Sequence, residues 1–179
     1  MEKSIEEIWD LFRETDRRMK ETDRRMKETD RKIAEATKAV ADLGGKWGRF
    51  VEGLVVPAVE NLFKEWGIEL DKVFPRVKAR RNGDKMEIDV LAINGEYAML
   101  IEVKSTLGVD DVKEHLEKLK SFKAFFPEYQ DRKVLGAVAG IVIEAGADRF
   151  AYKNGLFVIG QTGETVKVLN DRKFKPREW

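Results

Sequence analysis

Cysteine is absent from the 179 residues, and His115 is the only histidine. A zinc site built from cysteine and histidine is therefore excluded, and so is any disulfide. No P-loop and no Gly-x-Ser-x-Gly nucleophile elbow occurs. No apolar run approaches the roughly eighteen residues of a membrane span, and no signal peptide opens the chain. We therefore expect a cytoplasmic protein that does not enter a membrane.

A strong basic excess is also missing, because 34 Lys and Arg stand against 33 Asp and Glu. Nucleic-acid-binding proteins often show such an excess, so contacts to phosphates must come from local clusters here. One cluster comprises Lys72, Arg76, Lys78, Arg80 and Arg81. Lysine and arginine bind phosphates without reading the base sequence. The alternative interpretation is an ordinary solvated surface.

Two segments rich in Ile, Val and Leu, 86–94 and 98–104, are separated by a short polar stretch that begins with Asn94-Gly95. Asn-Gly is a strong signal for a hairpin turn, because both residues tolerate a positive φ. The pattern therefore predicts a two-stranded hairpin. If Asn94-Gly95 is the whole loop, Asp89 pairs with Leu100.

The charged side chains of this hairpin include Asp89, Glu102 and Lys104. Side chains alternate between faces along a strand, so Glu102 and Lys104 share a face, and Asp89 is the diagonal neighbour of Glu102. One or two carboxylates commonly hold Mg²⁺, and a neighbouring ammonium can orient a water or stabilise charge. A surface ion pair is the alternative. Buried charges are costly unless paired or bound to metal, which favours the metal site.

Asp89, followed after a strand and a turn by Glu102-Val103-Lys104, resembles the signature of the PD-(D/E)xK nuclease superfamily. Ile88 stands where that superfamily usually has proline. The likeness spans about residues 43–160. The long N-terminal segment and the closing residues 174–179 resemble an uncharacterised prokaryotic family of the superfamily. This resemblance implies an α/β fold: a restriction-endonuclease-like mixed central sheet flanked by helices, after a long N-terminal coiled-coil helix.

The resemblance also implies roles for individual residues. Asp89 and Glu102 would bind Mg²⁺ or Mn²⁺, with the carbonyl of Val103 as a further ligand. Lys104 would position or activate the attacking water. Glu52 would be the acidic residue of the preceding helix and would order a second ion or its waters.

The resemblance leaves two positions open. Glu60 competes with Glu52 as the acidic residue of the preceding helix. The helix that follows the Glu-x-Lys strand often adds a polar residue to the site, and Lys120 is the candidate, with a solvated lysine as the alternative. His115 lies on the same predicted helix, and we expect it at the surface.

The N-terminal third carries a heptad repeat, in which residues 14–20 recur as 21–27 and loosely as 28–34. The a positions are Ile5, Phe12, Met19, Met26, Ile33 and Val40, and the d positions are Ile8, Thr15, Thr22, Thr29, Ala36 and Leu43. Such a pattern predicts a coiled coil. Arg18 at g would face Asp23 at e of a parallel partner, which favours parallel assembly as a dimer or tetramer. The alternative is a helix that packs on its own domain or frays in solution.

Gly44-Gly45 interrupts the heptads and is expected to end or hinge the helix. Residues 1–43 are then a coiled-coil oligomerisation helix, and residues 44–179 are the nuclease-like domain. Pro57 is expected to bend or restart the helix before the hairpin. Strands are expected at 73–79, 135–143, 156–159 and 165–169, and helices at 109–126 and 144–154.

These patterns favour a metal-dependent endonuclease that hydrolyses phosphodiester bonds, with DNA as the substrate, assembled through the coiled coil. The alternative is a catalytically inactive nucleic-acid-binding or scaffolding protein on a nuclease-like fold. A third possibility is that the coiled coil recruits another protein.

Overall fold

The computed structural model describes the backbone of residues 2–179 and the side chains of residues 5–39 and 53–179. The chain divides into two compact units, Met1–Lys46 and Trp47–Trp179. The first unit is formed by the greater part of helix α1 (Glu2–Phe50), and the second contains all the strands of the described chain. No described helix combines the length and the apolar character that crossing a membrane requires.

Helix α1 is held together by interactions within one turn. Ion pairs at i, i+4 spacing join its charged residues, and Arg18 pairs in this way with Glu14 at 2.6 Å. Four hydroxyls donate to the carbonyl four residues earlier: those of Thr15, Thr22, Thr29 and Thr37. Every side chain from Ile5 to Ala39 is exposed. The apolar a and d positions described there therefore have no partner within their own unit.

Helix α1 continues through Gly44 and Gly45, so the prediction that these glycines end the helix is wrong. Glycine weakens a helix by about 1 kcal/mol relative to alanine but does not exclude helical angles. The alternative prediction, a hinge at this point, stays a prediction. A π-helical turn (Val51–Val55) follows, and α2 (Val56–Leu62) begins with Pro57 in its first turn. The predicted restart at Pro57 is confirmed, since the missing N–H of proline is not needed there.

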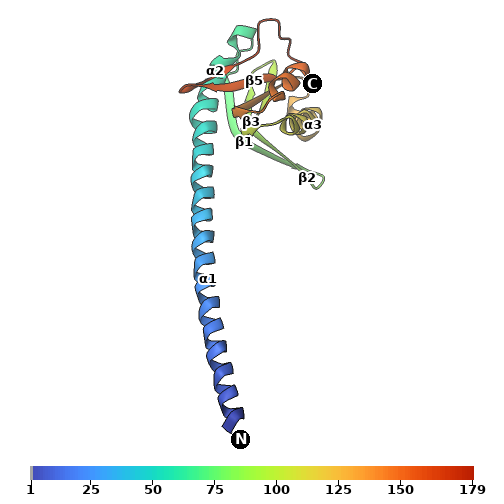
Figure 1. Cartoon of the computed structure of the whole chain (residues 1–179). Helices are drawn as coiled ribbons and strands as arrows, with labels where there is room; N and C mark the ends of the chain where they lie inside the picture. The colour runs from blue at the N-terminus through green and yellow to red at the C-terminus, as the bar shows by residue number, and fades with distance from the viewer. Residues whose placement is uncertain (1) are drawn as a thin grey trace. The chain divides into compact units, whose positions relative to one another are not determined.

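Six strands form one mixed sheet in the order β1-β2-β3-β4-β5-β6 (Figure 1). They are β1 (Lys72–Arg81), β2 (Asp84–Ile93), β3 (Tyr97–Leu107), β4 (Lys133–Ile143), β5 (Phe157–Thr162) and β6 (Thr165–Val168). The pairs β1–β2 and β2–β3 are antiparallel, β3–β4 and β4–β5 are parallel, and β5–β6 is antiparallel. The predicted fold class is confirmed: a long N-terminal helix precedes a restriction-endonuclease-like mixed sheet flanked by helices.

Helices cover both faces of this sheet. Helix α3 (Val109–Phe125) packs Leu119 and Phe122 on the face that carries Leu100, and α4 (Ala147–Lys153) joins the same cluster. Helix α2 packs Val59 on the opposite face, which carries Val103. Strand β4 is buried from residue 134 to residue 140, as predicted for a central strand, because both faces are covered there.

The β2–β3 loop is longer than Asn94-Gly95 alone. The Oδ1 atom of Asn94 accepts hydrogen bonds from the N–H groups of Glu96 at 2.8 Å and Tyr97 at 2.6 Å. This Asn-centred turn holds four residues between the paired residues Ile93 and Ala98.

Candidate active site

The candidate site begins where β2 leaves β3. These strands pair from Val90 to Ile93, and β2 continues with β1 as a hairpin that extends beyond the rest of the sheet (Figure 1). Asp89 is the first residue past the shared ladder, and the observed register places it across from Glu102. The predicted pairing of Asp89 with Leu100 is therefore wrong by two residues, because the loop is longer. A shift of two keeps both carboxylates on the predicted face.

At this fork the side chain of Asp89 forms a hydrogen bond with the backbone of β3, in place of a backbone group of β2. Its Oδ2 atom accepts the N–H of Val103 at 2.8 Å, which fixes the carboxylate beside β3. On its other side, the β1–β2 register places Arg76 across from Asp89, and this pair is skipped between Pro75↔Val90 and Val77↔Ile88. Arg76 has φ 55°, a left-handed conformation that is uncommon outside glycine. Such conformations cluster at functional sites, where the surrounding structure maintains them.

Glu102 is the buried acid of the site, with 5% of its side chain exposed. Two ammonium groups bind it: Nζ of Lys118 lies 2.8 Å from Oε2, and Nζ of Lys104 lies 3.1 Å from Oε1. Burial acts to raise the pKa of Glu102, but the hydrogen bond and charge of Lys118 outweigh it, and the pKa lies below its ordinary value. Glu102 is therefore ionised at neutral pH.

The pKa of Asp89 moves in the opposite direction. Burial raises it, and so does the nearby negative charge of Glu102, against the lowering effects of the Val103 N–H and the two lysines. Two carboxylates in one partly buried site repel each other. A cation bound between them would remove that repulsion.

Lys104 remains a cation in this environment. Burial acts to lower its pKa, but the hydrogen bond and charge of Glu102 raise it above the ordinary value. Its Nζ also lies 3.7 Å from Oδ1 of Asp111, whose Oδ2 accepts the N–H of Gly108 at 2.8 Å. Asp111 thus joins the start of α3 to Lys104 on β3.

Helix α3 supplies three polar residues that sequence reasoning missed: Asp111, His115 and Lys118. Their spacing of four and then three residues places them on one helix face. The sequence shows this spacing of the three polar residues, because the apolar residues that directly follow them repeat at the same interval. The face they occupy was not readable, since it depends on how α3 packs on the sheet.

His115 was predicted at the surface, and that prediction is wrong. The residue is 1% exposed, its Nε2 lies 3.2 Å from the carbonyl oxygen of Leu100, and its Nδ1 lies 3.8 Å from Oε2 of Glu102. Burial lowers the pKa of His115 from 6.5 to about 4, against the opposing charge of Glu102. The ring is therefore neutral at neutral pH, and its position follows from the apolar stripe of α3.

The acidic residue of the preceding helix is less well defined. The side chain of Glu52 lies outside the described residues, so its predicted role stays a prediction. The competitor Glu60 is exposed on α2. Because α2 covers the face that carries Val103, Glu60 belongs to a helix on the side of the sheet opposite Glu102.

The basic residues predicted to contact phosphates are all exposed: Arg76, Lys78, Arg80, Arg81 and Lys120. The first four lie on β1. Lys78 pairs with Glu87 of β2 at 3.2 Å, whereas Lys120 pairs with Glu117 of its own helix at 2.5 Å. The structure does not bring Lys120 to the carboxylates. Lys118, two residues earlier, occupies that place.

The residues present fit a hard divalent cation. Asp89 and Glu102 provide carboxylate oxygens from adjacent strands, and Val103, whose carbonyl is the further candidate ligand, directly follows Glu102 on β3. In the part of the chain whose side chains are described, no group of three or more His, Cys, Asp or Glu gathers around one point. The pair of carboxylates suits Mg²⁺, which is commonly bound by one or two carboxylates and keeps several waters.

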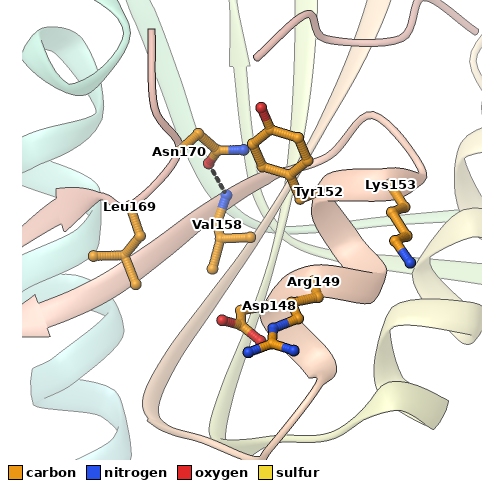
Figure 2. Close-up of a pocket in the computed structure, with 7 residues that line it drawn as sticks. All are labelled: Asp148, Arg149, Tyr152, Lys153, Val158, Leu169 and Asn170. Carbon is orange, nitrogen blue, oxygen red and sulfur yellow. Dashed lines mark hydrogen bonds between the residues drawn. The ribbon is translucent and has the colours of Figure 1, made fainter. Parts of the chain in front are cut away.

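A separate hollow of about 230 Å³ lies among α4, β5 and the segment after β6 (Figure 2). Val158 and Leu169 give it apolar walls, and Asp148, Arg149 and Lys153 are charged residues around it. It contains neither Asp89 nor Glu102 nor Lys104, and so it is not part of the candidate active site.

No family model and no curated protein matches this chain. Among solved structures, a repair endonuclease from Pyrococcus abyssi is similar at 22% identity and a TM-score of 0.39, over 54% of this chain and 42% of that one. The protein of unknown function AF1548 is similar at 16% identity and a TM-score of 0.40, over 65% of this chain and 58% of that one. EndoMS in complex with double-stranded DNA is similar at 19% identity and a TM-score of 0.39, over 61% and 44%. This chain spans about half the length of the structures it matches.

Proposed function

We propose that this protein is a metal-dependent endonuclease that hydrolyses phosphodiester bonds in DNA. The observation that carries the proposal is the buried, ionised Glu102, which lies beside Asp89 at the fork of β2 and β3 and is bound by Lys104 and Lys118. Two carboxylates for a divalent ion and two ammonium groups for a phosphate are the parts that such hydrolysis requires.

Each residue has a role in this proposal. Asp89 and Glu102 hold Mg²⁺ or Mn²⁺, with the carbonyl of Val103 as a further ligand. When bound, the ion lowers the pKa of a water and neutralises charge that develops on the phosphate. Lys104 is protonated, so it orients the water or stabilises the transition state as a cation. Glu52 orders further waters from the preceding helix.

The β1–β2 hairpin is the proposed contact for the DNA backbone. Its exposed Arg76, Lys78 and Arg80 lie on the strand next to the one that carries Asp89. Near its tip, Arg81 and Lys123 line a hollow of about 350 Å³ beside α3. Such residues position a duplex through its phosphates and do not select a base sequence. Lys120 is a further candidate on α3.

Assembly through α1 completes the proposal. Ile5, Phe12, Met19, Met26 and Ile33 occupy a positions and are 55 to 65% exposed. The Thr hydroxyls at d are already bonded to their own helix, so burial against a partner leaves no hydroxyl unsatisfied. We infer a parallel coiled coil between copies of this chain, as a dimer or tetramer, which would carry two or more active sites. Residues 1–43 are then the oligomerisation helix. The cytoplasmic location stays a prediction.

A cleavage screen over double-stranded, single-stranded and branched DNA and RNA, with Mg²⁺ or Mn²⁺, tests the activity. We expect cleavage of DNA by the wild type, and its loss in both Asp89→Asn and Lys104→Ala without a change in folding. Asp84→Asn, an exposed carboxylate at the hairpin tip, is the matched control and should cleave normally. Undiminished cleavage by Asp89→Asn and Lys104→Ala would refute the assignment. No cleavage and no Mn²⁺ uptake by the wild type would favour the inactive scaffolding protein instead.

A further inference from the structure

Glu102 is bound by two cations although it carries one negative charge. Lys104 comes from its own strand, and Lys118 comes from α3. With Asp89 included, these four residues carry two carboxylates and two ammonium groups, and His115 beside them is neutral. The charges of the four residues therefore balance before any divalent ion enters.

Like Lys104, which also contacts Asp111, Lys118 has a second carboxylate, and in its case that carboxylate is mostly exposed to solvent. Its Nζ lies 3.7 Å from Oε1 of Glu114, one turn earlier on α3, and the side chain of Glu114 is 64% exposed. The side chain of Lys118 is itself 22% exposed. A flexible four-carbon stem lets this ammonium turn from Glu102 towards Glu114 without any movement of the helix.

We propose that Lys118 is a tethered counter-ion for Glu102 that a divalent cation displaces, and that the released ammonium then binds the phosphate of the substrate. The inference rests on the proposed function and names the residue that couples its two ligands. In the resting protein, Lys118 holds Glu102 in its ionised form. When the divalent ion neutralises Glu102, the same ammonium lies beside a site with excess positive charge, which attracts an anion.

Two consequences follow from this exchange. Lys118 competes with the divalent ion, so it lowers the affinity for metal in the absence of DNA. A phosphate that draws Lys118 away from Glu102 removes this competition, so DNA raises the affinity for metal. By linkage, metal raises the affinity for DNA by the same factor.

Calorimetric titration with Mn²⁺ at about pH 8.5, where the carboxyl groups are ionised, tests the first consequence. We expect Lys118→Met to bind Mn²⁺ about tenfold more tightly than the wild type or better, since the variant has no competing ammonium. Lys113→Met is the matched control, because Lys113 lies on the same helix and pairs with Asp110 instead. It should bind Mn²⁺ with wild-type affinity. Equal or weaker binding by Lys118→Met would overturn the proposal.

The second consequence is tested with Ca²⁺ and a DNA duplex of about 20 base pairs, so that coupling is measured without depending on turnover. DNA should tighten Ca²⁺ binding severalfold in the wild type and in Lys113→Met, and this coupling should disappear in Lys118→Met. Coupling that persists in Lys118→Met would refute the role of the released ammonium.

Folding and the proposed function are controlled separately. Lys118→Gln repeats both titrations with a shorter neutral side chain, and melting curves of both variants check the fold. If both variants unfold, the fold requires Lys118, and its release by metal is refuted. If the wild type binds Mn²⁺ but Lys118→Met binds no more tightly, this inference fails alone. If the wild type binds no Mn²⁺, the inference and the proposed function fail together.

Discussion

The buried His115 makes the stability of this protein sensitive to mild acid. The pKa of the ring falls from 6.5 in the unfolded chain to about 4 in the folded protein, chiefly through burial. Below about pH 6.5 the unfolded state therefore binds a proton that the folded state does not bind. The free energy of unfolding falls as the pH drops from about 6.5 towards 4, and this contribution levels off below about 4.

The size of the effect follows from the two pKa values. The difference corresponds to about 3 kcal/mol when it is fully developed. At about pH 5 the unfolded ring is almost fully protonated and the buried ring is largely neutral, which gives a loss of about 2 kcal/mol relative to about pH 7.5. His115→Gln removes the titrating group and keeps an N–H donor for the carbonyl of Leu100.

Urea unfolding at about pH 7.5 and about pH 5, in the presence of a chelator, measures this loss in both proteins. Asp89 and Glu102 are also titratable groups, with pKa values displaced in opposite directions, but both remain in the variant. The difference between the two proteins therefore isolates His115. We expect the wild type to lose about 2 kcal/mol more than His115→Gln. Equal losses would show that His115 does not hold the neutral form in the folded protein.

Two further predictions concern the tail and the assembly. Gly155→Ala should lower the free energy of unfolding by about 2 to 4 kcal/mol, because Gly155 has φ 78° and a Cβ there would lie 2.4 Å from the C-terminal tail. Gly163→Ala, with φ 62° and open space around it, should cost only about 1 kcal/mol in the same urea assay. The double variant Met19→Glu, Met26→Glu should sediment as a smaller species than the wild type at equal concentration, because like charges enter the core. An unchanged sedimentation coefficient would contradict the coiled coil.

The strands and the charged residues of the hairpin were readable from the sequence because they depend on local patterns. Runs of Ile, Val and Leu marked β2 and β3, and the period of two assigned Asp89 and Glu102 to one face. The register was not readable. It depends on the side chain of Asn94, which widens the turn through two hydrogen bonds of its own.

The sequence could not predict which residues of α3 enter the site, and the reason is different. Lys118 and Lys120 are equally polar, and the helical period alone does not say which of them meets the sheet. The choice is made by tertiary packing, because Leu119 and Phe122 enter the core and turn Lys118 towards Glu102. The prediction for His115 was wrong for the same reason, since histidine occurs on either face of an amphipathic helix.

The buried ion cluster offers a way to test whether this protein is an enzyme or a scaffold. Replacing a buried ion pair by apolar residues of similar volume is often neutral or stabilising, whereas removing one partner is strongly destabilising. A protein that needed only this fold would therefore gain nothing from Glu102 and Lys118, while a cation site requires the carboxylate. We expect the double variant Glu102→Met, Lys118→Met to unfold with a free energy equal to or above that of the wild type, and to take up no Mn²⁺.

Urea unfolding and calorimetry of this double variant, beside Glu102→Met alone, decide the point. The single variant leaves Lys118 facing an apolar side chain, so it should be less stable than the double variant by about 1 to 3 kcal/mol. A double variant that is less stable than the wild type by more than about 2 kcal/mol would mean that the pair stabilises the fold in its own right. The charges would then have a structural reason to be there, and the inactive scaffold would gain support over the nuclease.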